Sequence, residues 1–178
     1  MGCCSKLCSK LCCPKEYRIL MSGLRLSGKT AILHKFQAGG KVEIISPFDS
    51  PFEFISCGRL NITVSNDNGK RVRVLWLHYL SNTDGIIYVI DCNEEETIDD
   101  ALEELKKMVN EKELAKKPFL ILCNKIDLEK HIPPDEIKIK IENRIPEINE
   151  KKWEVMGTSA VTGVGIEEAL EWLRSTFP

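Results

Sequence analysis

The sequence lacks three features that would place it in a specialised class of protein. No apolar run approaches the roughly 18 residues that a membrane-spanning helix needs, and the N-terminus has no continuous apolar core of about 7 residues, as a secretory signal does. The formal net charge is only −2, so no strong field favours a nucleic acid as partner. The 178 residues, 43% hydrophobic and 29% charged, fit one globular domain with a full core.

Cysteine is frequent, with eight residues, but its distribution argues against a disulfide scaffold. Five of the eight lie in the first 13 residues, whereas Cys57, Cys92 and Cys123 are far apart in the rest of the chain. Cys92 and Cys123 sit in apolar, strand-like runs. We interpret these as small apolar side chains in the core of a reduced, cytosolic protein. The three histidines do not cluster, and we assign no catalysis to them.

Apolar, strand-like runs alternate with helical patterns along the chain. The run Gly85–Asp91 (GIIYVID) is apolar up to its last residue, which is typical of a strand buried on both faces. In 97–114, apolar residues recur at helical spacing, and Thr97 with Asp100 predicts a capping box. This alternation predicts an α/β fold with a parallel sheet, helices on both faces and ligands at the carboxyl ends of strands. The expected strands are 17–21, 52–56, 60–64, 85–91, 119–124 and 153–158, and the expected helices are 29–37, 97–114, 134–144 and 166–176.

Residues 23–30, GLRLSGKT, match the phosphate-binding pattern G-x-x-x-x-G-K-[ST] in full. The match follows an expected strand and opens an expected helix, which is the context that the motif requires. The two glycines let backbone N–H groups surround phosphate oxygens, and the lysine adds a positive charge. The threonine hydroxyl can ligate Mg²⁺. The predicted nucleotide-binding residues are Gly23, Leu24, Arg25, Leu26, Ser27, Gly28, Lys29 and Thr30, and Thr30 is also the predicted metal ligand.

A second motif, NKID at residues 124–127, follows the expected strand 119–124 and selects the base. Asp127 can accept hydrogen bonds from the two N–H donors of guanine, while Asn124 assists and the stem of Lys125 packs on the base. Adenine lacks that donor pair and would leave the carboxylate unpaired. In TSA at residues 158–160, Ser159 and Ala160 can offer a backbone N–H to the base, although a plain exit from a strand explains this stretch nearly as well.

The chain resembles the ADP-ribosylation-factor-like (Arf-like) small GTPases, most strongly in LWLHYLSNTDGIIYVIDCN at residues 75–93. GLRLSGKT, NKID and GTSAVTGVGIEEALEWL match further elements of that family in order and spacing, so the resemblance covers nearly all of 17–177. It implies a P-loop small-GTPase fold with a six-stranded, mostly parallel sheet, a GTP/GDP ligand with Mg²⁺, and a role at membranes in vesicle traffic or organelle identity.

The segment that senses the terminal phosphate departs from the family pattern. Without a gap, the family's D-x-x-G-Q falls on Ser65 to Gly69; with one gap, Asn66 replaces the acid and Lys70 the glutamine. A third interpretation makes Asn68–Gly69 a hairpin turn followed by a returning strand. No alternative restores the acid or the glutamine. In the other switch, IISPFDSPF at 44–52, Ser46 is the nearest hydroxyl to the expected threonine, and we do not expect it to ligate the metal.

These departures predict weak hydrolysis and poor discrimination between GDP and GTP. An arginine finger alone contributes about 10³ to 10⁵ in rate and acts together with the orienting glutamine. Arg25 stands where the family usually has Asp; it either reaches the terminal phosphate or, as we favour, is a solvated side chain at the rim of the loop.

The N-terminal stretch MGCCSKLCSKLCCP predicts a membrane anchor. Gly2 is a candidate for a myristoyl group, with Lys6 where the usual pattern has Ser or Thr, and Cys3 and Cys4 are candidates for palmitate. Stable anchoring takes two such signals. A helix here would place its Cys and Leu residues on one face, and Pro14 would end it. We therefore expect an anchored tail at 1–16 and a GTPase domain at 17–178.

The leading hypothesis from the sequence is an Arf-like guanine-nucleotide-binding protein, cytoplasmic and peripheral at the Golgi, another endomembrane or the plasma membrane. Its expected partners are membrane lipid, protein effectors and an exchange factor, with no nucleic acid. One alternative is a working GTPase whose catalytic groups come from Arg25 or a partner. The other is a nucleotide-independent scaffold that keeps only the fold.

Overall fold

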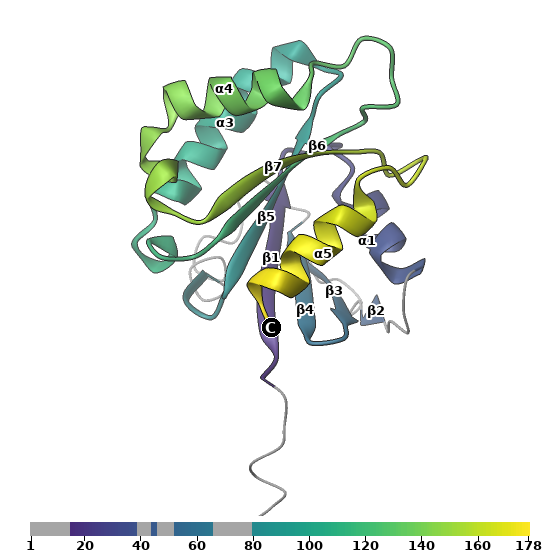
Figure 1. Ribbon diagram of the computed structural model, residues 1–178, viewed down its shortest axis with the longest axis vertical. Helices are drawn as coiled ribbons and strands as arrows, with labels where there is room; N and C mark the ends of the chain where they lie inside the picture. The colour runs from purple at the N-terminus through teal and green to yellow at the C-terminus, as the bar shows by residue number, and fades with distance from the viewer. Residues whose placement is uncertain (1–14, 39–43, 46–51, 66–79) are drawn as a thin grey trace, which may run out of the picture.

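The computed structural model describes residues 15–38, 44–45, 52–65 and 80–178. At its centre lies a sheet with strand order β2-β3-β4-β1-β5-β6-β7 (Figure 1). The strands are β1 (Tyr17–Gly23), β2 (Ile44–Ile45), β3 (Phe52–Cys57), β4 (Leu60–Ser65), β5 (Gly85–Asp91), β6 (Phe119–Asn124) and β7 (Trp153–Thr158). The helices are α1 (Lys29–Ala38), α3 (Glu95–Val109), α4 (Pro134–Arg144) and α5 (Ile166–Thr176), with short 3₁₀ turns η1 (Lys112–Leu114) and η2 (Pro146–Glu150).

The sheet is mostly parallel, as the sequence predicts. Strand β1 pairs in parallel with β4 and β5, and β5, β6 and β7 continue in the same sense. Strands β2 and β3 run antiparallel to their neighbours at one side. All six expected strands are present, and the two-residue β2 adds a seventh. The predicted α/β fold of the small-GTPase type is confirmed.

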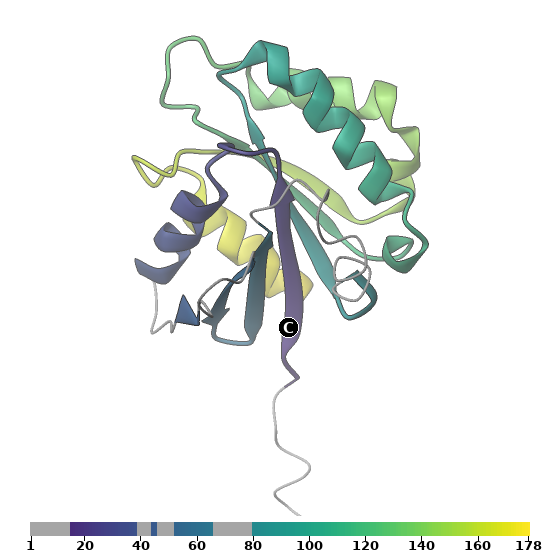
Figure 2. The same cartoon turned by 180° about the vertical axis from the view of Figure 1, so that it is seen from behind.

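Helices cover both faces of the sheet, with α3 and α4 on one face and α1 and α5 on the other (Figures 1 and 2). The apolar stripe of α3 explains its position, because every member of the stripe is buried against the sheet. The central strands β5 and β6 are buried along their whole length, as strands covered on both faces must be. In the described ranges, no helix is both long and apolar enough to span a bilayer.

The predicted capping box at Thr97 is wrong. Helix α3 begins earlier, at Glu95, with Glu94 in the N-cap position and no side-chain hydrogen bond there. Thr97 already lies in the first turn, and its hydroxyl donates to the carbonyl oxygen of Glu94 at 2.9 Å. The expected helix 97–114 also divides, since α3 ends at Val109 and a separate turn, η1, follows.

Cys92 and Cys123 are fully buried and not in a disulfide, which agrees with their assignment to the core. A hydrogen bond with the Cys92 thiol, together with burial, raises the pKa of Cys123. The thiol form is therefore favoured, and both sulfurs act as apolar packing.

Candidate functional site

The loop between β1 and α1 has the backbone conformation that a phosphate cradle requires. Gly23 and Gly28 have φ angles of 144° and 95°, which favour glycine, and Leu26 is left-handed at 64°. A Cβ at Gly23 would overlap the carbonyl oxygen of Val89, and one at Gly28 would overlap the side-chain amide of Asn124. Both glycines are thus required by close packing as well as by backbone angle.

Lys29 is buried at the first position of α1, with its ammonium group turned back onto the loop. Its Nζ donates hydrogen bonds to the carbonyl oxygens of Gly23 at 2.9 Å and Leu24 at 2.7 Å. Burial lowers the pKa of Lys29 from 10.5 to about 8, and the carboxylate of Glu53 on β3 opposes part of this effect. A cation held in a poorly solvated loop is suited to an anionic ligand.

Asn124 connects three loops at the carboxyl edge of the sheet. It lies at the end of β6 and is 1% exposed. Its Nδ2 donates to the carbonyl oxygen of Ser27 at 2.9 Å, and its Oδ1 accepts from the backbone N–H of Ala160 at 3.2 Å. The GLRLSGKT, NKID and TSA motifs, far apart in the sequence, therefore meet around one side chain.

Lys125 forms an ion pair with Asp91, the last residue of β5, which is 7% exposed. Lys125 has a left-handed φ of 70°, and the other oxygen of Asp91 accepts from the backbone N–H of Asn93 at 3.0 Å. Sequence reasoning did not assign Asp91 to the site. Its position could have indicated a role in the site, because Asp91 ends a buried strand. In the structure it pairs in register with Asn124 on β6.

The remaining predicted residues surround the same edge. Asp127, Arg25 and Leu26 are exposed, whereas Leu24 and Thr30 are half-buried. Ser159 is buried, and its hydroxyl oxygen accepts backbone N–H groups from the next turn at 3.0 and 3.2 Å. Among the described residues, the Ser27 hydroxyl is buried without a hydrogen-bond partner beside the cradle. This orphan hydroxyl and the two constrained glycines fit a loop that closes around a phosphate group.

Of the altered switch segments, only a small part lies in the described residues. Ser65 ends β4 and is buried, with an exposure of 4%. Ser46, Asn66, the possible turn at 68–69 and Lys70 lie outside the described residues, as do Gly2, Cys3 and Cys4. The described part of the chain contains no cluster of three or more His, Cys, Asp or Glu side chains that could hold a metal.

A cavity of about 250 Å³ lies elsewhere, between β1, β3 and β4. Arg18 and Asn61, which contribute to its wall, stand at the amino-terminal ends of their strands, away from the cradle. The nucleotide assignment therefore depends on the constrained loop and its neighbours, not on this cavity.

A phosphate-cradling loop, a base-selecting motif and a mostly parallel sheet between helices define a small GTPase of the P-loop type. The comparison with protein families agrees, because the model of the ADP-ribosylation factor family matches residues 4–177. The chain belongs to this family of GTP-binding small GTPases, and the resemblance seen in the sequence is confirmed.

Proposed function

We propose that this protein binds GDP and GTP at the cytosolic face of a membrane and recruits protein partners there, with weak or absent GTP hydrolysis. The observation that carries the nucleotide assignment is the bridge made by Asn124 between the carbonyl oxygen of Ser27 and the N–H of Ala160. This bridge holds the phosphate loop and the base-selecting loops in one fixed arrangement, so that one ligand can contact both.

The roles follow from the chemistry of each group. The backbone N–H groups of residues 23–30 and the ammonium group of Lys29 bind the phosphates, and the Asp127 carboxylate accepts from the guanine edge. Lys125 is held by its ion pair with Asp91, and its stem is proposed to pack on the base. The Thr30 hydroxyl is the only ligand for Mg²⁺ that we propose from the chain. When bound, that ion supplies positive charge to the outer phosphates.

Weak hydrolysis is proposed because neither alignment of the second switch has an acid at the position of the family's Asp or a glutamine at the position of its Gln. In the ungapped alignment, Ser65 replaces the family's acid. Its side chain is neutral and is buried at the end of β4. A switch needs different affinities for its two ligands. Without the groups that sense the terminal phosphate, the affinities for GDP and GTP become similar.

Membrane attachment is proposed for the tail at 1–16, through acyl groups on Gly2, Cys3 and Cys4, with the GTPase domain at 17–178. Partner recruitment in vesicle traffic at the Golgi, another endomembrane or the plasma membrane is the role proposed with it. An exchange factor is the expected partner for loading.

Titration of the nucleotide-free chain with labelled GDP and GTP, with and without Mg²⁺, tests this proposal. We expect tight binding of both nucleotides, with affinities within about tenfold of each other, and very slow single-turnover hydrolysis. Asp127→Asn should lower the affinity for guanine nucleotides by several orders of magnitude, because the amide offers a donor where an acceptor is needed. Rapid hydrolysis would instead support the working GTPase, and undetectable binding of either nucleotide would support the scaffold.

A further inference from the structure

Only two charged side chains are buried in the part of the chain that the structure describes, and both lie at the carboxyl edge of the sheet. One is Lys29 in the phosphate loop. The other is Asp91, which ends β5 and is 7% exposed. A carboxylate removed from water is unfavourable unless its oxygens are paired. The partners of Asp91 therefore indicate what it does.

Both oxygens of Asp91 have partners beside the base-selecting motif. One oxygen forms the ion pair with the ammonium group of Lys125, and the other accepts from the backbone N–H of Asn93 at 3.0 Å. The side chain of Lys125 keeps 31% of its surface exposed. Its stem therefore still borders the solvent while its charged end is held by the buried carboxylate.

The backbone of Lys125 is fixed independently of this pair. Its φ angle of 70° lies in the left-handed region, which is strained for a residue with a side chain. The residue before it, Asn124, is held by both ends of its side-chain amide. The residue after it, Ile126, donates its N–H to the carbonyl oxygen of Thr158 at 3.3 Å. With both ends of the lysine held, the torsion angles of its stem have little freedom.

The backbone next to Asp91 holds the same loop from a second side. The N–H of Cys92 donates to the carbonyl oxygen of Asn124 at 3.0 Å, and the carbonyl oxygen of Cys92 accepts from the N–H of Ile132 at 2.8 Å. Residues 91–93 thus contact the NKID motif at its first residue, at its lysine and in the chain that follows. The end of β5 therefore sets the position of the base-selecting loop.

We propose that Asp91 is a positioning residue for the guanine base, because it holds the ammonium group of Lys125 and so keeps the lysine stem against the base. The ion pair neutralises the ammonium charge, so Lys125 acts through its apolar stem and not through attraction to the phosphates. Its contribution is then the same for GDP and GTP, which share the base. This inference rests on the proposed binding of guanine nucleotides and deepens it.

Titration of the full-length chain with labelled GDP and GTP, in the presence of Mg²⁺, tests this role. Asp91→Asn removes the charge but keeps an oxygen that can accept from the Asn93 N–H. It should lower the affinity for both nucleotides by the same factor, about tenfold. Lys125→Met keeps an apolar stem without the ammonium group and should lose about as much. The double variant should also lose about tenfold and not about a hundredfold, since both changes remove one interaction.

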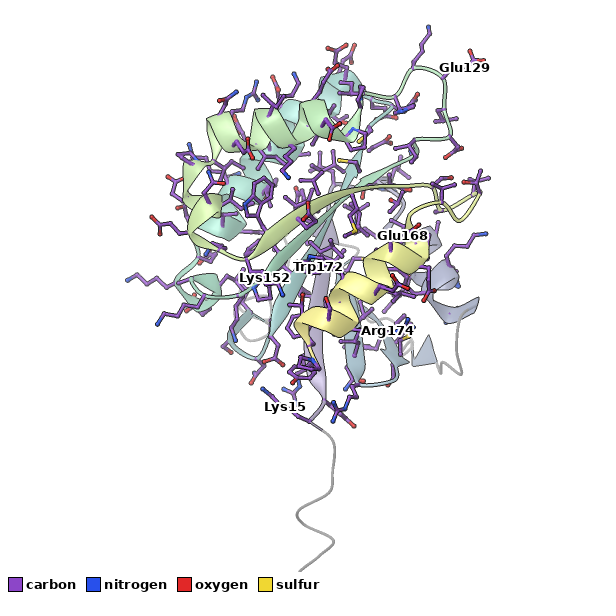
Figure 3. All side chains as sticks on the ribbon, in the orientation of Figure 1. Lys15, Glu129, Lys152, Glu168, Trp172 and Arg174 are labelled. Atoms are coloured by element: carbon purple, nitrogen blue, oxygen red, sulfur yellow. The ribbon has the colours of Figure 1, made fainter. Side chains whose placement is uncertain are left out.

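Asp84→Asn is the matched control, just before the other end of β5. The Asp84 carboxylate accepts from the backbone N–H of Arg18 at 3.0 Å, at the amino edge of the sheet. Figure 3 shows how far apart the two edges are, with Glu129, in the loop after NKID, and Lys15, before β1, at opposite ends of the molecule. This variant should change the affinity for GDP by less than about twofold.

Unchanged or tighter binding by Asp91→Asn would overturn the proposal, because the ion pair would then belong only to the empty site. Losses that differ between GDP and GTP, or that multiply in the double variant, would also overturn it. Thermal melts of the nucleotide-free variants check the fold. If Asp91→Asn does not fold, Lys125→Met decides, and unchanged GDP binding by that variant overturns the proposal.

The wild-type chain separates this role from the proposed function. If it binds neither nucleotide, the proposed nucleotide binding fails, and the role of Asp91 fails with it. If it binds both while Asp91→Asn and Lys125→Met behave as wild type, only the positioning role fails.

Discussion

Lys29 is a buried lysine, and burial disfavours the charged form of its side chain. Its pKa is lowered to about 8 in the folded protein against 10.5 for an unperturbed lysine. The difference corresponds to roughly 3 kcal/mol of destabilisation at any pH below 8. Between pH 8 and 10.5 the unfolded chain binds more protons than the folded one, so the stability contributed at this position rises with pH.

Lys29→Met should therefore stabilise the nucleotide-free protein at pH 7 while abolishing nucleotide binding. The expected gain is about 1–3 kcal/mol, because the hydrogen bonds to Gly23 and Leu24 are lost with the charge. The gain should shrink by pH 10, where the wild-type lysine is neutral when folded. Urea unfolding of both proteins at the two pH values measures it. A variant less stable than wild type at pH 7, or an equal difference at both pH values, would contradict the assignment.

At the scale of elements, the loop between β1 and α1 depends on glycine for two separable reasons. Gly28 has a φ of 95° and also faces the Asn124 amide, whereas Gly58, in the turn between β3 and β4, has a φ of 64° and open space around it. A side chain at Gly58 meets only backbone strain. One at Gly28 meets strain and collision with the residue that joins the three loops.

Gly28→Ala should reduce GDP affinity by at least about tenfold and cost roughly 1–3 kcal/mol of stability. Gly58→Ala should cost about 1 kcal/mol and leave GDP binding unchanged. Chemical denaturation and GDP titration of the two variants measure both effects. If Gly28→Ala bound GDP like wild type, the contact between Gly28 and Asn124 would not position the loop.

The helices and strands also show how much of the fold could be predicted from the sequence. Apolar periodicity located six strands and four helices, because burial on one or both faces leaves a regular pattern. It missed β2, whose two residues are too short for a pattern, and misplaced the start of α3, where Thr97 satisfies a carbonyl inside the helix. The motif spacings predicted which loops meet. The bridge at Asn124 and the pair of Lys125 with Asp91 required the tertiary structure, since their partners lie in loops and a strand that are distant in the sequence.

For the whole molecule, the C-terminal residues close the sheet against β1. Phe177 is 8% exposed, its ring lies 5.2 Å from that of Tyr17, and it packs over Gly85 at the start of β5. The Tyr17 hydroxyl donates to the carbonyl oxygen of Pro178 at 2.9 Å. The last turn of the chain thus joins the first and fifth strands.

Phe177→Ala should destabilise the protein by about 3 kcal/mol, since truncation of a buried aromatic ring leaves a cavity. Tyr17→Phe, which removes only an exposed hydrogen bond, should cost less than about 1 kcal/mol. Thermal or urea unfolding of the two variants gives the comparison. Equal losses would contradict the expectation that ring packing contributes more than the hydroxyl to holding the C-terminus in place.

The contact of Pro178 with Tyr17 places the last residue of the fold next to the beginning of β1 (Figure 1). A bulky tag fused after Pro178 would therefore begin beside the Tyr17 ring, at the amino end of β1. A fusion at this end should carry a flexible spacer, so that the hydrogen bond between Tyr17 and Pro178 is kept.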